Sequence, residues 1–165
     1  MGMIVSMLRF SKAKLEAYKA EPSLFEVDAS AAEESESGSL YLDKSWEGIH
    51  YLLTGGKVGE GEEPLSLIMF SGQHFDEEQD MGYGPACYLE QEQVAIIAKA
   101  LSIWDEARFR QRFIPEEMEA AEIYPTGWSN DPEDQFQYLW EYFTQLKTFY
   151  SEASQEGQAI ASYIG

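Results

Sequence analysis

The sequence has few of the residues on which common catalytic and metal-binding sites depend. Its 165 residues include one cysteine, Cys87, and two histidines, His50 and His74. A single cysteine excludes a disulfide within the chain and the paired-cysteine spacing of a zinc site. A glycine-rich phosphate loop and a Gly-x-Ser-x-Gly nucleophile elbow are also missing from the sequence. We therefore expect no metal and no cofactor, and the sequence assigns no catalytic residue.

Basic residues are scarce as well. The chain has 11 lysines and arginines against 30 aspartates and glutamates, which gives a formal net charge of −19. Most of such a surface would repel phosphate backbones and anionic lipids, so we expect no nucleic acid and no membrane as a partner. A basic protein would be attracted by the same charge, although the charge would equally serve solubility.

Long apolar runs are also lacking. No stretch of the sequence approaches the roughly 18 residues that a membrane-spanning helix requires. The N-terminus does not show the cationic and then apolar pattern of a secretory signal. Together with the low cysteine content, these features lead us to expect a soluble cytoplasmic protein.

The sequence does contain enough apolar material for one sizeable core, with 44% hydrophobic and 14% aromatic residues. No linker or internal repeat divides this material, so residues 1–165 are expected to form a single domain. Apolar runs predict strands at 3–10, 83–89 and 159–164. Helical periodicity and end signals predict short helices at 12–20, 43–54, 94–101, 105–113 and 115–122, and a helical turn at 65–70. The acidic segment 29–39 is predicted to be a surface loop.

The longest predicted helix runs from 132 to about 156. Asp131 and Pro132, followed by two acidic residues, are typical of a helix start, and Gly157 is typical of a stop. Its principal apolar stripe consists of Phe136, Leu139, Phe143, Leu146 and Tyr150. Three further aromatic residues, Tyr138, Tyr142 and Phe149, fall outside this stripe and must contact another layer, a second copy of the chain or a partner.

The short helix after Asp43 places Trp46, Ile49, His50 and Leu53 on one stripe, which should face the interior. Asp43 and His50 suggest a carboxylate–imidazole pair. Seven helical residues would separate them by about 10.5 Å along the axis, beyond direct hydrogen-bond reach. His50 alone could act as a base with Trp46 as a stacking wall, or it could be a core histidine with its hydrogen bonds satisfied.

An aromatic loop precedes the long helix and contains Tyr124 and Trp128. Such a loop could form one wall of a binding cleft, or it could pack as a lid on the core. The candidate pocket predicted from the sequence therefore consists of Asp43, Trp46, His50, Tyr124 and Trp128.

Two other polar features have simple structural explanations. Cys87 lies in a predicted strand without a nearby base, which favours an inert buried thiol over a nucleophile. His74 precedes a group of acidic residues whose spacing matches no defined metal motif, so a solvated acidic loop is favoured there.

Several short motifs follow one another along the chain. They are Met1-Gly2-Met3-Ile4, Leu42-Asp43-Lys44 with Trp46 and His50, Leu53-Thr54-Gly55, Pro64-Leu65-Ser66, and Ile123-Tyr124-Pro125. In these motifs and their order the chain resembles the YfbM-like family of uncharacterised bacterial proteins. The resemblance implies a single α+β domain in which a small, mostly antiparallel sheet is covered by several helices, to which the sequence pattern adds one long C-terminal helix. It implies no activity and no site residues.

Two classes of function remain open at this point. The first is a non-catalytic binding or protein-interaction module, which would use its acidic surface toward a basic protein partner or self-associate through the surplus aromatic residues of the long helix. The alternative is a small-molecule-binding protein or enzyme with a pocket around Trp46, His50, Tyr124 and Trp128. An enclosed pocket that contains His50 would favour the alternative.

Overall fold

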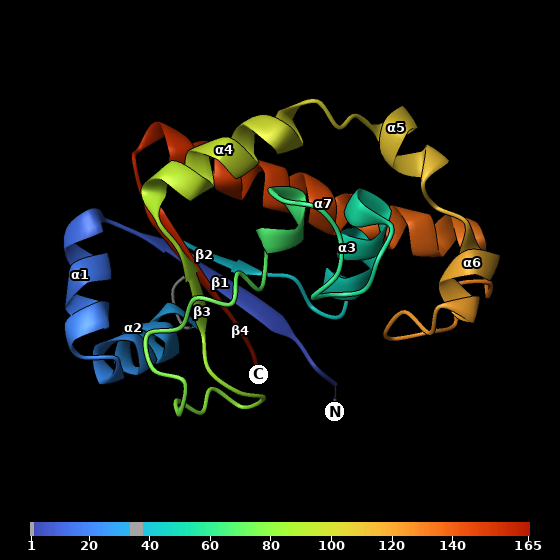
Figure 1. Ribbon diagram of the computed structural model, residues 1–165. Helices are drawn as coiled ribbons and strands as arrows, with labels where there is room; N and C mark the ends of the chain where they lie inside the picture. The colour runs from blue at the N-terminus through green and yellow to red at the C-terminus, as the bar shows by residue number, and fades with distance from the viewer. Residues whose placement is uncertain (1, 34–37) are drawn as a thin grey trace.

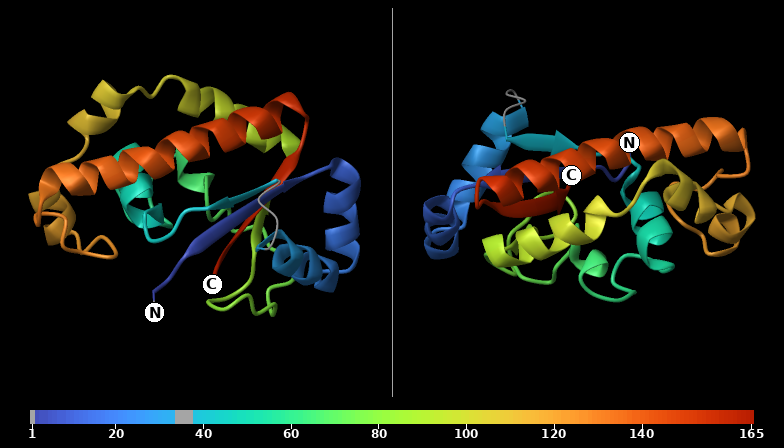
Figure 2. Two further views of the ribbon diagram at one scale, coloured as in Figure 1. Left: turned by 180° about the vertical axis from the view of Figure 1, so that it is seen from behind. Right: turned by 90° about the horizontal axis from the view of Figure 1, so that it is seen from above.

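The computed structural model describes residues 2–33 and 38–165, which form an α+β fold around one four-stranded antiparallel sheet (Figure 1). The strands are β1 (Val5–Phe10), β2 (Ser39–Tyr41), β3 (Cys87–Leu89) and β4 (Ala159–Ile164), in the order β2-β1-β4-β3. The first and last strands pair along their whole length in the centre of the sheet, from Val5 opposite Ile164 to Phe10 opposite Ala159. The two ends of the chain therefore lie side by side (Figures 1 and 2).

Seven α-helices surround the sheet within the described residues, together with a 3-10 turn at Leu65–Leu67. They are α1 (Lys12–Ala20), α2 (Ser23–Glu33), α3 (Trp46–Thr54), α4 (Gln91–Ser102), α5 (Glu106–Gln111), α6 (Pro115–Ala120) and α7 (Pro132–Gln155). None of the described helices is both long and apolar enough to cross a membrane.

Elements with clear end signals form where the sequence predicts them. The Ser11 hydroxyl accepts a hydrogen bond from the Lys14 amide at 3.2 Å and so caps α1. The long helix α7 has Pro132 in its first turn and ends next to Gly157. The predicted cap by the Asp131 side chain is wrong, because Asp131 has a left-handed backbone with φ of 53° and its carboxylate caps no amide of the helix.

The predicted loop at 29–39 is also wrong in part. Residues 29–33 belong to α2, residues 34–37 lie outside the described residues, and Ser39 begins β2. Helix α2 forms because alanines have high helix propensity and because Phe25 and Ala29 bury one side of it against the sheet. Composition alone misses this part of the helix because residues 29–33 are small or acidic, and only Ala29 among them is buried.

Two further boundaries differ from the prediction. Helix α3 begins at Trp46 because Asp43 has a left-handed backbone with φ of 50°, which a helix cannot continue through. Strand β3 begins only at Cys87 because Gly84, with φ of 107°, and Pro85 interrupt the extended backbone before it.

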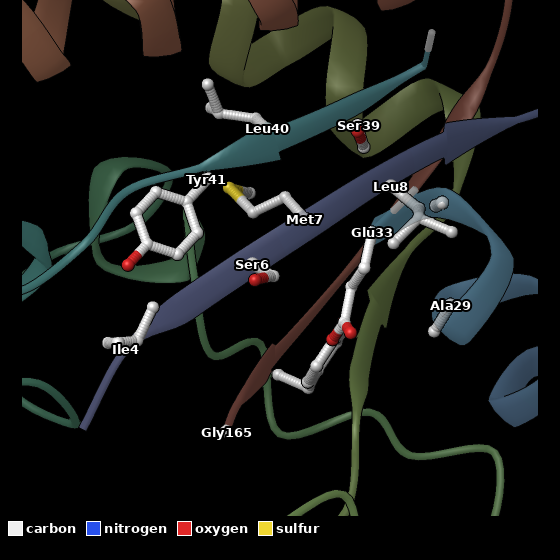
Figure 3. Close-up of a pocket in the computed structure, with 12 residues that line it drawn as sticks. Ile4, Ser6, Met7, Leu8, Ala29, Glu33, Ser39, Leu40, Tyr41 and Gly165 are labelled. Carbon is white, nitrogen blue, oxygen red and sulfur yellow. The ribbon is translucent and has the colours of Figure 1, made fainter. Parts of the chain in front are cut away.

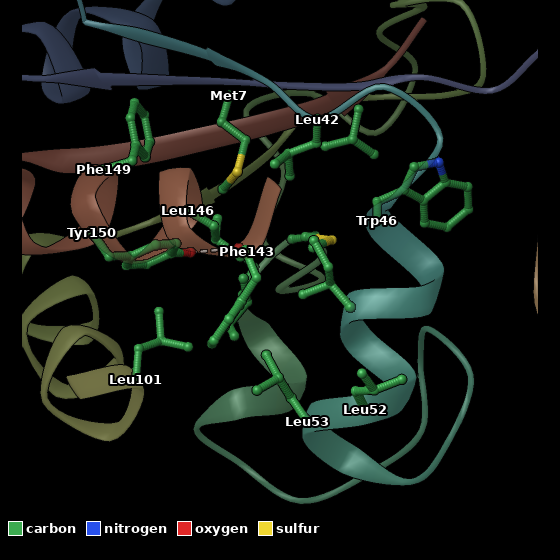
Figure 4. Close-up of a cluster of buried hydrophobic side chains, with 14 of the residues drawn as sticks. Met7, Leu42, Trp46, Leu52, Leu53, Leu101, Phe143, Leu146, Phe149 and Tyr150 are labelled. Carbon is green, nitrogen blue, oxygen red and sulfur yellow. Dashed lines mark hydrogen bonds between the residues drawn. The ribbon is translucent and has the colours of Figure 1, made fainter. Parts of the chain in front are cut away.

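Helices α3, α4 and α7 cover one face of the sheet and form the larger hydrophobic core. Val5 and Met7 of β1 point into this core because successive residues of a strand face opposite sides. Figure 4 shows Met7 directed toward Phe149, Leu146 and Phe143 of α7, with Trp46 of α3 at the edge of the cluster. Large side chains from three helices thus close this face.

Helices α1 and α2 pack on the opposite face, at one end of the sheet (Figures 1 and 2). Leu8 and Phe10 of β1 point toward them, and Phe25 of α2 packs against Phe10 and Tyr18 with ring centroids 6.4 and 5.3 Å away. This second core is smaller than the first, and among residues 2–33 and 38–165 it leaves part of the sheet uncovered beside it.

Candidate functional site

A pocket of about 620 Å³ lies where α2 stops covering the sheet (Figure 3). Its floor comes from the neighbouring strands β2, β1 and β4, and α2 forms one wall. The lining residues are Ile4, Ser6, Met7, Leu8, Ala29, Ala32, Glu33, Ser39, Leu40, Tyr41, Tyr163 and Gly165.

The hollow follows from a fall in side-chain size along α2. Phe25, Ala29 and Ala32 recur at helical spacing and share the side of α2 that faces the sheet. Phe25 fills the space at its end of the helix, whereas the short side chains of Ala29 and Ala32 line the pocket at the other end. Ser6 is similarly small on the facing part of β1, so the space between helix and sheet stays open.

The polar groups of the pocket are mainly hydroxyls and one carboxylate. The Tyr163 hydroxyl donates to Glu33 Oε1 at 3.4 Å. Burial raises the pKa of Tyr163, the negative charge of Glu33 adds to this rise, and a hydrogen bond from Ser6 opposes it. Tyr163 therefore stays protonated at neutral pH and acts as a hydrogen-bond donor rather than a base.

Tyr41 stands at the opposite rim, with 53% of its surface exposed. Its hydroxyl donates to Asp43 Oδ1 at 3.4 Å, and its pKa is raised by partial burial and by the nearby Asp43 charge. Both tyrosines of the pocket are thus neutral donors beside a carboxylate. The described lining contains no histidine, cysteine, lysine or arginine, so the arrangement suits binding better than proton transfer or nucleophilic attack.

A smaller pocket of about 230 Å³ adjoins the first and shares Ala29, Glu33 and Tyr163 with it. It adds Glu26 and Ser30 of α2 and Asp80 and Met81 of the loop before β3. We call the larger space the sheet pocket and the smaller one the acidic pocket. Glu33 and Tyr163 mark the boundary between them.

The predicted candidate residues lie elsewhere, on the side of α3 and the aromatic loop. Trp46 is buried, and its indole N–H donates to the carbonyl oxygen of Met3 at 2.9 Å. The Tyr124 hydroxyl accepts from the Met3 amide at 2.9 Å, and its ring centroid lies 5.6 Å from that of Trp46. The structure thus brings Trp46 and Tyr124 together, where they hold the segment that leads into β1.

Trp128 is fully buried in the core. Its indole N–H donates to the Ile123 carbonyl at 2.8 Å, and its amide donates to the Glu119 carboxylate. The ring lies so close to α3 that a Cβ on Gly48 would come within 2.8 Å of Trp128 Cη2. Glycine at position 48 therefore allows α3 and the aromatic loop to pack together.

His50 is 3% exposed, and its Nε2 lies 3.1 Å from the carbonyl oxygen of Glu60. Since a carbonyl only accepts, Nε2 carries the hydrogen. Burial lowers the pKa of His50 more than the neighbouring carbonyls and carboxylates raise it. The side chain is therefore a neutral core histidine that fastens the loop after α3.

Asp43 has partners other than His50. Its Oδ2 accepts from the Tyr138 hydroxyl at 2.6 Å, and the Tyr138 hydroxyl accepts from the Lys44 amide at 3.1 Å. None of the five predicted residues lines the sheet pocket or the acidic pocket. A binding pocket around them stays a prediction.

The three surplus aromatic residues of α7 find contacts within the chain. Phe149 is 5% exposed and belongs to the larger core. Tyr138 is half-buried, bonds to Asp43 and packs edge-on against Tyr142, with ring centroids 5.1 Å apart. These contacts satisfy the aromatic residues without a second copy of the chain. Self-association through them and a basic protein partner both stay predictions.

Cys87 does have an imidazole beside it, contrary to the prediction. Its Sγ lies 3.6 Å from His74 Nδ1, because His74 forms a bridge with Cys87 at the edge of the sheet. Nδ1 also lies 3.0 Å from the Ala86 carbonyl oxygen, so it carries a hydrogen and cannot take the thiol proton. Burial raises the pKa of Cys87. The predicted burial of the thiol is confirmed, and its lack of reactivity stays a prediction.

The described residues form no cluster of metal ligands. Within 2–33 and 38–165, no three His, Cys, Asp or Glu side chains gather in a way that could hold a metal ion. The acidic residues after His74 instead make local turn contacts, such as the Asp76 carboxylate with the Glu78 amide at 3.0 Å.

The residues of the sheet pocket were not among the predicted site residues. One sequence signal could have indicated the pocket: Ser6 is a small polar residue between apolar neighbours of a buried strand. Glu33 lies in the segment that was predicted to be a loop. Tyr163 lies in a correctly predicted strand, but nothing in its neighbourhood indicates which groups face it.

Comparison with known proteins places the chain in a family but gives it no activity. No protein with a curated description matches it. The crystal structure of YfbM from Escherichia coli, described as a protein of unknown function, is similar with a TM-score of 0.72 and 20% sequence identity, covering 99% of this chain and 100% of that one. This likeness shows a common fold. The model of a domain of unknown function, DUF1877, matches residues 1–163, and the chain therefore belongs to the DUF1877 family.

Proposed function

We propose that this chain is a non-catalytic binding module that takes a small amphipathic organic molecule in the sheet pocket. The observation that carries the proposal is the pocket itself: a hollow of about 620 Å³ between α2 and the sheet, with a few polar groups at its ends. Ligand sites in proteins are commonly about 300–1,000 Å³ in volume, largely apolar and furnished with a few convergent polar groups.

The lining fits a ligand with an apolar body. Ile4, Leu8 and the two alanines of α2 offer apolar surface, which an alkyl chain or ring would shield from water. Burial of apolar ligand surface contributes about 25 cal/mol per Å² before the costs of association are subtracted. The hydroxyls of Ser6 and Tyr163 then favour a ligand with a polar end.

The chemistry around the pocket supports binding without a reaction. The two histidines and the cysteine are engaged elsewhere, His50 with Glu60, and His74 with Ala86 and Cys87. The tyrosines that line the pocket have raised pKa values and stay protonated. The pocket thus offers hydrogen-bond donors and one carboxylate, which can orient a ligand.

Calorimetric titration with 1-octanol tests this proposal, because octanol has an apolar chain and a neutral polar end. We expect saturable binding to the unmodified chain and none to Ala32→Trp, whose indole would fill the sheet pocket. The matched control is Ala31→Trp, since Ala31 is the preceding residue of α2, is exposed and does not line the pocket. Absence of saturable binding, or equal binding by the two variants, would overturn the proposal.

A further inference from the structure

We infer that the ligand of the sheet pocket is an amphipathic amine: its alkyl body would lie over β1 and its ammonium group would lie beside Glu33, at the entrance to the acidic pocket. The inference rests on the proposed function and adds the charge of the ligand to it. The geometry that carries it is the junction of an apolar pocket with an acidic one.

The two pockets meet at residues that both of them share. Glu33 and Tyr163 line each pocket, and Ala29 lies between them on α2. Figure 3 shows the Glu33 side chain extending from α2 over the sheet, toward the chain end at Gly165. A molecule that filled the apolar part would therefore bring its end group to the Glu33 carboxylate.

The charged side chains that line the two pockets within the described residues are all acidic. Glu26, Glu33 and Asp80 line the acidic pocket, and no lysine or arginine lines either pocket within the described residues. None of the three carboxylates takes part in an ion pair among residues 2–33 and 38–165. An anionic end group would be repelled here, whereas an ammonium group would be attracted.

Two basic residues, Arg9 of β1 and Lys14 of α1, are paired with other acids. Lys14 pairs with Asp28 at 3.0 Å, and the Asp28 carboxylate also accepts from the Tyr18 hydroxyl at 2.5 Å. Arg9 pairs with Glu152 and Glu156 of α7 at 3.1 and 3.2 Å. These bases therefore do not neutralise Glu33, which contacts the neutral Tyr163 hydroxyl at 3.4 Å.

The apolar part of the pocket distinguishes an organic amine from an inorganic cation. A hydrated metal ion would gain nothing from the side chains of Ile4, Leu8 and Ala32, and it would leave most of the sheet pocket empty. An alkyl amine uses both parts, since its chain covers the apolar floor and its charge reaches the carboxylate. The required ligand is therefore apolar at one end and cationic at the other.

Three probes of equal chain length test the charge: 1-octylamine, 1-octanol and octanoate, titrated at pH 7 and low salt by calorimetry. We expect octylamine to bind on the order of fivefold more tightly than octanol, the value for one partly exposed ion pair, and octanoate to bind most weakly. Raised salt should reduce the preference for the amine. Glu33→Gln should abolish this preference, so that the variant binds octylamine no more tightly than octanol.

Glu117→Gln is the matched control, because Glu117 is also exposed but belongs to α6, at the other end of the molecule (Figure 1). It removes the same charge and should retain the preference for the amine. Loss of the preference in both variants would show a general charge effect and overturn the inference. Equal binding of octanol and octylamine would overturn the inference but leave the proposed function standing, whereas no binding of any probe would overturn both.

Discussion

The two faces of the sheet differ in the size of the side chains that cover them. On the face of α3, α4 and α7, residues such as Met7, Phe143 and Tyr150 fill the space between strands and helices. On the face of α2, Phe25 fills one end, but Ala29, Ala32 and Ser6 leave a pocket of about 620 Å³ at the other. The same strand, β1, contributes to both faces. The closed face is thus filled by large side chains, whereas the open face carries the hollow in which we propose a ligand site.

Truncation of a large side chain on the closed face should have the largest effect. Trp46→Ala removes packing against Phe70 and Tyr124 and the hydrogen bond to Met3. We expect it to lower the free energy of unfolding by about 3–5 kcal/mol in urea denaturation, a large part of the total for a domain of this size. Tyr83→Ala is the control, because Tyr83 is 58% exposed, and it should cost about 0.5 kcal/mol or less. Similar stability of the two variants would contradict the assignment of Trp46 to the core.

Enlarging one alanine on each face of the sheet should show directly that the two faces differ in packing. Ala153 of α7 is fully buried in the larger core, so Ala153→Leu should overpack it and cost about 1–3 kcal/mol of unfolding free energy. Ala32→Leu adds the same three carbon atoms next to the sheet pocket and should change the stability by about 0.5 kcal/mol or less. An equal loss of stability in both variants would show that the face of α2 is packed as tightly as the other.

A smaller, pH-dependent effect is expected from His50. Because burial lowers its pKa from the ordinary value of 6.5, the unfolded chain binds a proton that the folded chain does not bind just below that pH. His50 therefore contributes its full stability above about pH 6.5, and this contribution falls as the pH is lowered toward its folded pKa. The slope for one proton is at most about 1.4 kcal/mol per pH unit.

The measurement is urea denaturation between pH 7.5 and 5 for the unmodified chain and for His50→Gln, which keeps a donor for the Glu60 carbonyl. The two proteins contain the same carboxylates, so the difference between their free energies of unfolding reports the titration of His50. It should shrink as the pH falls through this range. A difference independent of pH would mean that His50 titrates alike in the folded and unfolded chain.

Local signals in the sequence predicted much of the fold. Ser11, Pro132 and Gly157 mark helix ends through the backbone conformations and capping bonds that they favour, and α1 and α7 form accordingly. Strand β2 was missed because it has only three residues and depends on pairing with β1, which no local pattern reports. The same limit applies to Cys87, whose contact with His74 depends on a bridge between two segments.

The sheet pocket could not have been predicted from the sequence in the same way. Ser6, Glu33 and Tyr163 are brought together by the pairing of the first and last strands and by the docking of α2. The pocket also depends on the relative sizes of Phe25, Ala29 and Ala32, and hydrophobic periodicity treats these three residues alike. The residues around Trp46 and His50 were conspicuous in the sequence because they share one helical stripe. In the structure, this stripe packs a helix against two loops.

The ligand site proposed on the open face of the sheet is tested most directly by the position of amide chemical-shift changes when 15N-labelled protein is titrated with 1-octylamine. The account predicts that saturable changes centre on Ser6, Leu8, Ala32 and Tyr163, and that the amides of α3 and of residues 123–128 stay unperturbed. Changes centred instead on Trp46, His50, Tyr124 and Trp128 would contradict the account, and they would place the site in the pocket predicted from the sequence.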